Sequence, residues 1–169
     1  MKMFNKINIF KIISNHFNTL QNDNTKKCEF DDILTFLILP LLVSVGLYWF
    51  DFELKENAIN IIITTLSIFV GLLFNIIVIL FDIIKRDNTK KLKNEILRQL
   101  LTNISYSIFI SILIIIVILT TYIKNECVHL IATVIVYFLI GHFFLTILMI
   151  LKRMYFLFIN ELKEIEKDK

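Results

Sequence analysis

The chain has 169 residues, of which 57% are hydrophobic and 20% charged, with a formal net charge of +3. Its mean hydropathy of +0.74 and its 16 Phe residues lie outside the range of soluble globular domains. The composition therefore excludes an ordinary soluble domain and predicts a chain whose main solvent is lipid.

Residues 1–20 carry apolar side chains three and four positions apart, a spacing that suits one face of a helix. Lys6 falls within that face, so we expect a helix in the lipid headgroup region, where lysines can reach phosphates. A helix that docks a partner protein is an equal alternative. The polar residues that follow predict a link, so 1–32 form a cytoplasmic arm and linker.

Four apolar segments then reach the roughly 20 residues that a helix needs to cross a bilayer. They cover residues 33–50, 58–84, 104–123 and 129–151. Pro40 lies inside the first segment, where it is tolerated if a neighbour satisfies the carbonyl that proline leaves free. We predict an all-α polytopic membrane protein whose transmembrane domain spans residues 33–151.

Lys and Arg residues predict the orientation of these spans, because basic residues are retained in the cytoplasm. Of the 18, 16 lie before the first span, in the loop 85–103 or in the tail 152–169. Both termini should therefore be cytoplasmic. Leu92, Ile96 and Leu100 predict that the loop is a helical extension of the third span. The basic residues expected to contact anionic lipids or a partner protein are Lys2, Lys6, Lys11, Lys90, Lys91, Lys93 and Arg98.

The second span carries its small and polar residues within a sector of about 80° on a helical wheel. They are Thr64, Ser67, Gly71, Asn75 and Asp82, here called the stripe. Small residues let helix backbones approach, and an amide can hydrogen-bond across the contact. Intramolecular helix packing, a subunit interface and a pore lining are the three interpretations, in that order. For Asp82, an ion pair with Lys85 or Arg86 is the first expectation.

The third and fourth spans also carry polar residues. Asn103, Ser107, Ser111 and Thr121 share one side of the third span. In the fourth, Thr133, Tyr137 and Gly141 lie nearly opposite His142 and Thr146. Two polar faces are hard to bury in a lone four-helix bundle, which predicts a homo-oligomer. His142 is near mid-membrane, where it is either a sensor or a neutral imidazole bonded to a neighbouring helix.

Catalytic and metal-binding motifs are absent from the sequence. There is no glycine-rich phosphate loop and no nucleophile beside a base, and His16, His129 and His142 are scattered. The prediction is that the protein is no enzyme and holds neither metal nor cofactor. Its basic inner segments should meet lipid headgroups in preference to nucleic acid, so no direct nucleic-acid binding is expected.

The organisation of the chain resembles a known family. The arm MKMFNKINIFKIISNHF, the basic loop KRDNTKKLKNEILRQLL and four short spans are similar to KwaA, the membrane subunit of the Kiwa anti-phage defence system. The resemblance implies a homo-oligomer, a tetramer, in the inner membrane of a bacterium. This protein would sense phage attack at the envelope and hold a cytoplasmic DNA-binding effector. It assigns no individual residues.

These observations together predict a membrane sensor or scaffold that recruits a soluble effector. The alternative is a pore-forming effector or small ion channel.

Overall fold

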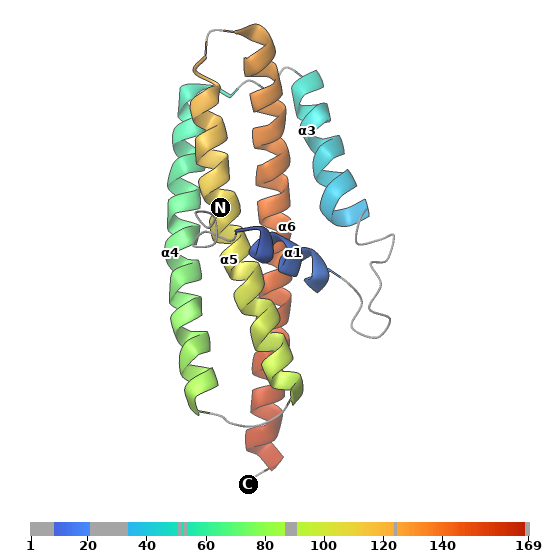
Figure 1. Cartoon of the computed structure of the whole chain (residues 1–169), viewed down its shortest axis with the longest axis vertical. Helices are drawn as coiled ribbons and strands as arrows, with labels where there is room; N and C mark the ends of the chain where they lie inside the picture. The colour runs from blue at the N-terminus through green and yellow to red at the C-terminus, as the bar shows by residue number, and fades with distance from the viewer. Residues whose placement is uncertain are drawn as a thin grey trace, which may run out of the picture.

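The computed structural model describes residues 9–20, 34–50, 52, 54–86, 91–123 and 125–167, and every regular element among them is a helix. In chain order they are α1 (Ile9–Thr19), η2 (Leu34–Ile38), α3 (Leu39–Trp49), α4 (Glu56–Arg86), α5 (Lys91–Thr120) and α6 (Glu126–Lys167). The prediction of an all-α fold is confirmed (Figure 1).

Three helices, α4, α5 and α6, are long and apolar enough to cross a membrane, which indicates a membrane protein. The first predicted span forms the shorter apolar stretch Leu34–Trp49. At about 1.5 Å per residue it extends roughly 24 Å, less than a hydrocarbon core of about 30 Å. A fourth span and the orientation of the chain stay predictions.

The long helices continue beyond the apolar segments expected from the sequence. Helix α5 starts at Lys91, so most of the loop 85–103 is helical and joins the third span without a break. Helix α6 has 42 residues and includes most of the tail 152–169. Its length of about 63 Å is twice a hydrocarbon core. One end of the molecule therefore extends well past any bilayer that the helices cross.

The helices form a row rather than a closed bundle. Helix α5 packs on α6, α4 packs on α5, α3 packs on α6, and α1 crosses α5 near its middle (Figure 1). Within the described residues, α3 and α4 have no Cα atoms within 8 Å of each other. Helices α3 and α4 are thus the two edges of the row.

Helix α4 packs through apolar residues at seven-residue intervals: Ile59, Leu66, Leu73 and Leu80 are all buried. On α5, Leu97, Ile104, Ser111 and Ile118 repeat at the same interval and are also buried. A seven-residue repeat keeps one seam facing its partner along two helices that coil around each other. Lipid tails are as apolar as leucine, so close packing rather than escape from water stabilises such a seam.

Helices α3 and α6 approach closely at Gly141. A Cβ atom at this position would lie 3.2 Å from the Cβ of Pro40, which is buried. One turn further along α3, Ser44 is also fully buried. The absence of a side chain at Gly141 therefore lets the start of α3 lie directly on α6.

Replacement of Gly141 by leucine should destabilise the fold, because the new side chain would overlap Pro40. Overpacking of this kind costs about 1–3 kcal/mol. The measurement is the melting temperature of the purified protein in detergent micelles, which should fall in Gly141→Leu.

Gly71→Leu is the matched control, because a Cβ at Gly71 meets nothing within 4 Å. Its melting temperature as a monomer should equal that of the parent, and any effect should be confined to the oligomeric state on native gels. Equal loss of monomer stability in both variants would contradict this account of the α3–α6 contact.

Candidate functional site

A buried hydrogen-bonded network joins η2, α5 and α6 through His142. One ring nitrogen, Nδ1, lies 2.9 Å from the backbone oxygen of Phe36, and the other, Nε2, lies 2.9 Å from the hydroxyl of Tyr106. A carbonyl oxygen can only accept, so the proton of the neutral imidazole is on Nδ1. Nε2 is therefore the acceptor, and the Tyr106 hydroxyl donates to it.

Pro40 explains why the Phe36 carbonyl is available. In a regular helix the N–H of residue 40 would donate to the carbonyl of residue 36, but proline has no N–H and its ring crowds that carbonyl. The chain accordingly forms a π-helical turn at Leu34–Ile38 before α3 begins. His142 supplies the missing donor from α6. The expectation that a neighbour satisfies the carbonyl freed by Pro40 is confirmed.

His16 attaches helix α1 to the same network. Its imidazole is 0% exposed and stacks on the ring of Tyr106, with centroids 3.7 Å apart and planes inclined by 6°. Its Nδ1–H donates to Oδ1 of Asn103 at 2.9 Å. The hydroxyl of Thr19 lies 2.8 Å from the same Asn103 oxygen and 2.7 Å from the His16 carbonyl. Tyr106 thus contacts one histidine through its ring and another through its hydroxyl.

Arg153 of α6 holds the end of α1. Its Nη2 donates to the backbone oxygen of Thr19 at 2.6 Å. The last carbonyls of a helix have no partner inside the helix and carry its partial negative charge. A guanidinium at this position is both a hydrogen-bond donor and a favourable charge.

The pKa of His16 is lowered from its ordinary 6.5 to about 4, chiefly by burial and also by nearby His142 and Arg153, whereas the hydrogen bond to Asn103 opposes the shift. His16 is therefore neutral at physiological pH. A base whose pKa falls on burial stabilises the buried state most above its free pKa. This stabilisation is lost as the pH falls from about 6.5 toward about 4.

The network positions α1, α5, α6 and η2 relative to one another. Within the described part of the chain, no group of three or more His, Cys, Asp or Glu residues could hold a metal ion. We therefore interpret the network as a device that couples α1 to α5, α6 and η2.

The polar residues of the third and fourth spans lie inside this single chain. Asn103, Ser107, Ser111, Thr121, Thr133, His142 and Thr146 are buried. The opposite side of α6 at Gly141 meets Pro40. The inference that one polar face of the fourth span needs another subunit is wrong, because α3, η2, α5 and α1 cover both faces. His142 forms hydrogen bonds to neighbouring helices, as expected if it is a neutral imidazole bonded to them.

The stripe on α4 behaves differently from its first interpretation. Thr64, Ser67, Gly71, Asn75 and Asp82 are all exposed in the single chain. Ser67 donates to the Ile63 carbonyl of its own helix at 2.8 Å. The interpretation that this stripe packs within the chain is wrong, because α4 instead turns its heptad of Ile and Leu residues toward α5. The side chains of Lys85 and Arg86, expected to pair with Asp82, lie outside the described residues.

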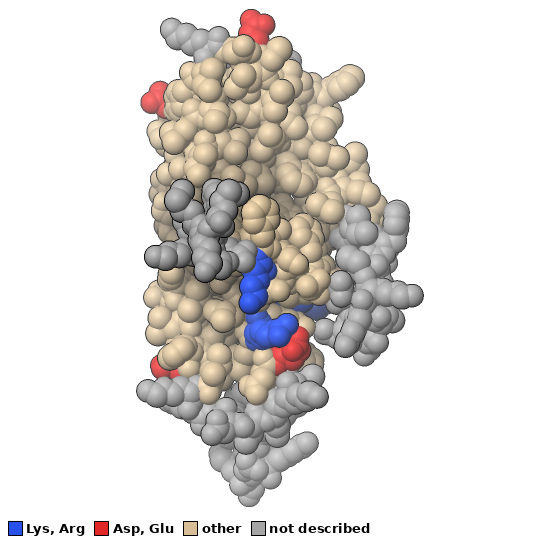
Figure 2. All heavy atoms as spheres, in the orientation of Figure 1, with Lys and Arg blue, Asp and Glu red and all other residues tan. Residues whose placement is uncertain are grey.

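Two of the predicted basic contact residues can be placed. Lys11 on α1 and Arg98 on α5 are exposed. Figure 2 shows Lys and Arg side chains gathered on this face just below the position of α1, beside an acidic side chain. Arg98 lines a small cavity of about 60 Å³ with Glu95, Asn15 and Asn18. Lys2, Lys6 and Lys90, and the side chains of Lys91 and Lys93, lie outside the described residues.

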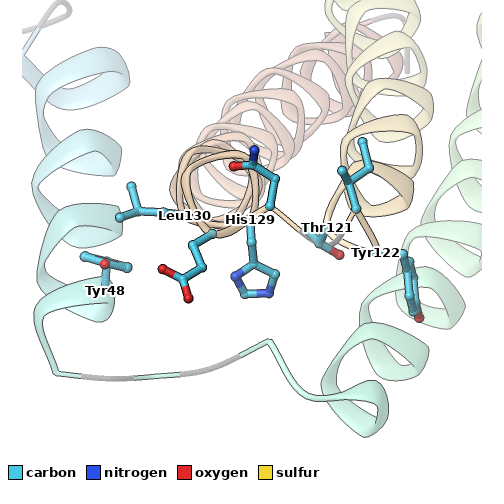
Figure 3. Close-up of a pocket in the computed structure, with 8 residues that line it drawn as sticks. Tyr48, Thr121, Tyr122, His129 and Leu130 are labelled. Carbon is cyan, nitrogen blue, oxygen red and sulfur yellow. The ribbon is translucent and has the colours of Figure 1, made fainter.

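A wider depression of about 720 Å³ lies at the opposite end of the molecule. Tyr48, Thr121, Tyr122, His129 and Leu130 line it, from the end of α3, the end of α5 and the start of α6 (Figure 3). His129 is exposed, and the depression is open to its surroundings.

No protein-family model, no curated protein and no solved structure matches this chain. The resemblance to the Kiwa membrane subunit therefore stays a prediction.

The sequence did not indicate His16, Tyr106 or Asn103 as members of one site. Pro40 and His142 were visible signals, since each is unusual in an apolar segment. Their pairing could not be read from the sequence, because 102 positions separate them.

A double-mutant cycle tests the cap on the Phe36 carbonyl. His142→Phe should cost less stability in a Pro40→Ala background than in the parent, because residue 40 then has an N–H for that carbonyl. The difference should be about 0.6 kcal/mol and at most about 1.7 kcal/mol, the range for membrane hydrogen bonds. It is measured from unfolding by denaturing detergent in mixed micelles.

Tyr137→Phe is the control for this cycle. The Tyr137 hydroxyl donates to the Phe52 carbonyl at 2.6 Å, away from Phe36. Its effect should be additive with Pro40→Ala. An equal cost of His142→Phe in both backgrounds would remove Pro40 from the explanation.

Proposed function

We propose that the protein is a multi-pass membrane sensor or scaffold that presents a cytoplasmic surface to a soluble effector. The observation that carries this proposal is the network around Tyr106. It ties α1, a helix outside the apolar spans, to residues of the third and fourth spans. A change in how the spans pack would alter the position of α1, which is the coupling that a sensor or scaffold requires.

Both termini are proposed to be cytoplasmic, with four spans including Leu34–Trp49. The distribution of 16 of 18 basic residues on one side supports this orientation. Helix α1 lies at the end of the apolar segments that carries Arg98 and Arg153. Phe10 on α1 is 83% exposed beside Lys11, as expected for a helix that inserts an aromatic ring among anionic headgroups.

The protein is also proposed to be a homo-oligomer, and a tetramer if the resemblance to the Kiwa family holds. The exposed stripe on α4 supports assembly, because Asn75 lies well inside an apolar helix of 31 residues. An amide that faces lipid lacks hydrogen-bond partners, whereas a neighbouring helix can provide them. Edge helix α4 is free within the single chain to meet a second copy.

A pore is the second candidate function, and the same stripe is the observation that favours it. Since Ser67, Gly71 and Asn75 face outward, only several copies arranged around an axis could line a channel with them. The anti-phage role and the DNA-binding effector rest on the family resemblance alone.

Labelling of single cysteines tests the proposed topology. In a Cys28→Ser background, native Cys127, which is exposed, should react with a membrane-impermeant maleimide in intact cells. Glu95→Cys, at an exposed position near the other end of α5, should react only after permeabilisation. Labelling of position 95 in intact cells would contradict the proposed topology.

Deletion and substitution distinguish the scaffold from the pore. Removal of residues 160–169 should leave an oligomer in the membrane but prevent co-purification of proteins encoded beside this chain, because it truncates the inner surface. Asn75→Ser keeps a small polar group and should preserve both properties. A dye that reports membrane potential should show no depolarisation on expression of either variant or the parent.

The pore predicts the reverse pattern. Expression of the parent alone would then depolarise cells, Asn75→Ser would change the ion flux, and the truncated protein would remain active. That result would exclude the scaffold.

A further inference from the structure

We propose that α1 is an acid-released latch, which docks on α5 while His16 is neutral and leaves α5 and α6 when His16 takes up a proton. The latch is a property of helix packing and does not rest on the proposed scaffold function. It gives this protein a response to acidification of the compartment that contains α1.

The surroundings of the His16 imidazole disfavour its charged form. The ring is completely buried, and Nδ1–H donates to Asn103. Nε2 has no hydrogen-bond partner among the described residues. A proton added at Nε2 would therefore create a buried N–H group that is both charged and unpaired, which is one of the costlier states for a polar group.

The hydrogen bond to Asn103 favours the charged form of His16, but the titratable groups that face the ring do not compensate this charge. From α5 the neighbour is Tyr106, an aromatic ring with a neutral hydroxyl. From α6 they are His142, with ring centroids 5.8 Å apart, and cationic Arg153, which binds the Thr19 carbonyl three residues along α1. The turn η2 has no titratable side chain, and Lys11 on α1 itself is a further cation.

Among the described residues, Glu95 and Arg98 on α5 are further charged groups near α1. They carry opposite charges and line the small cavity beside Asn15 and Asn18. Of the groups that face the imidazole, His142 and Arg153 both lower the pKa of His16.

The direction of the response follows from linkage. The pKa of His16 is about 4 when α1 is docked and 6.5 when the side chain is free in water. Docking is therefore strongest above pH 6.5. Below it, the ratio of undocked to docked protein rises by up to about tenfold per pH unit until pH approaches 4.

Helix α1 can leave without separating the long helices. In the described residues its backbone approaches only α5, and Phe10 on α1 is 83% exposed. The pairs α4–α5, α5–α6 and α3–α6 do not include α1. Release of α1 thus changes one surface while the row of helices persists.

Distances between two spin labels test the latch in the full chain, reconstituted in nanodiscs of phosphatidylcholine and phosphatidylglycerol. One label is placed on native Cys127 and the other at Asn18→Cys on α1, in a Cys28→Ser background. At pH 7.5 we expect one narrow distance. At pH 5.0 a second, broader population should appear, its ratio to the first having risen roughly 30-fold.

Two variants identify the titrating group. His16→Gln keeps an amide that can bond Asn103 but cannot titrate, so its distance distribution should be the same at both pH values. His142→Gln should retain the pH response of the parent. A single unchanged distance in the parent at pH 5.0 would overturn the proposal, as would a response that survives in His16→Gln and disappears in His142→Gln.

Discussion

The arrangement of this protein depends on one backbone group, the carbonyl of Phe36. Pro40 deprives it of its helical donor, and the Nδ1–H of His142 replaces that donor from α6. This bond fixes the proton on Nδ1, so Nε2 becomes the acceptor for Tyr106. With its hydroxyl so held, Tyr106 presents a ring face on which His16 stacks. A single series of contacts thus leads from the carbonyl freed by Pro40 through His142 and Tyr106 to His16, and connects η2, α6, α5 and α1.

Polar contacts can have this influence because burial of apolar surface contributes little to the association of helices in lipid. A leucine gains little by leaving lipid for another helix, so small residues and hydrogen bonds decide which helices lie together. Gly141 and Pro40 allow α3 to pack closely on α6, and Arg153 hydrogen-bonds the carbonyl at the end of α1. Helix α4 is the contrasting case, since its seam with α5 is built from buried Ile and Leu residues while its polar stripe faces outward.

The two surfaces left by this packing support different parts of the proposed function. The outward stripe on α4 is suited to contact with further copies of the chain. Helix α1 is held by His16 and by the bond from Arg153 to Thr19, and it is the element that we propose to be released by acid. A membrane sensor needs both a stable assembly and a part that moves, and the proposal assigns these roles to two different elements, α4 and α1.

The sequence by itself determined the fold class and three of the long apolar helices, because length and hydropathy are local properties that lipid makes decisive. It also indicated that the carbonyl freed by Pro40 needed a donor. Only the tertiary structure decided that His142 is this donor and that His16 and Asn103 join it, since these contacts bring together residues 87 to 106 positions apart. The stripe on α4 is a second feature that the sequence alone could not place. Helical periodicity placed its residues on one face, but which face turns inward depended on the competing heptad of Ile59, Leu66, Leu73 and Leu80 finding its match on α5.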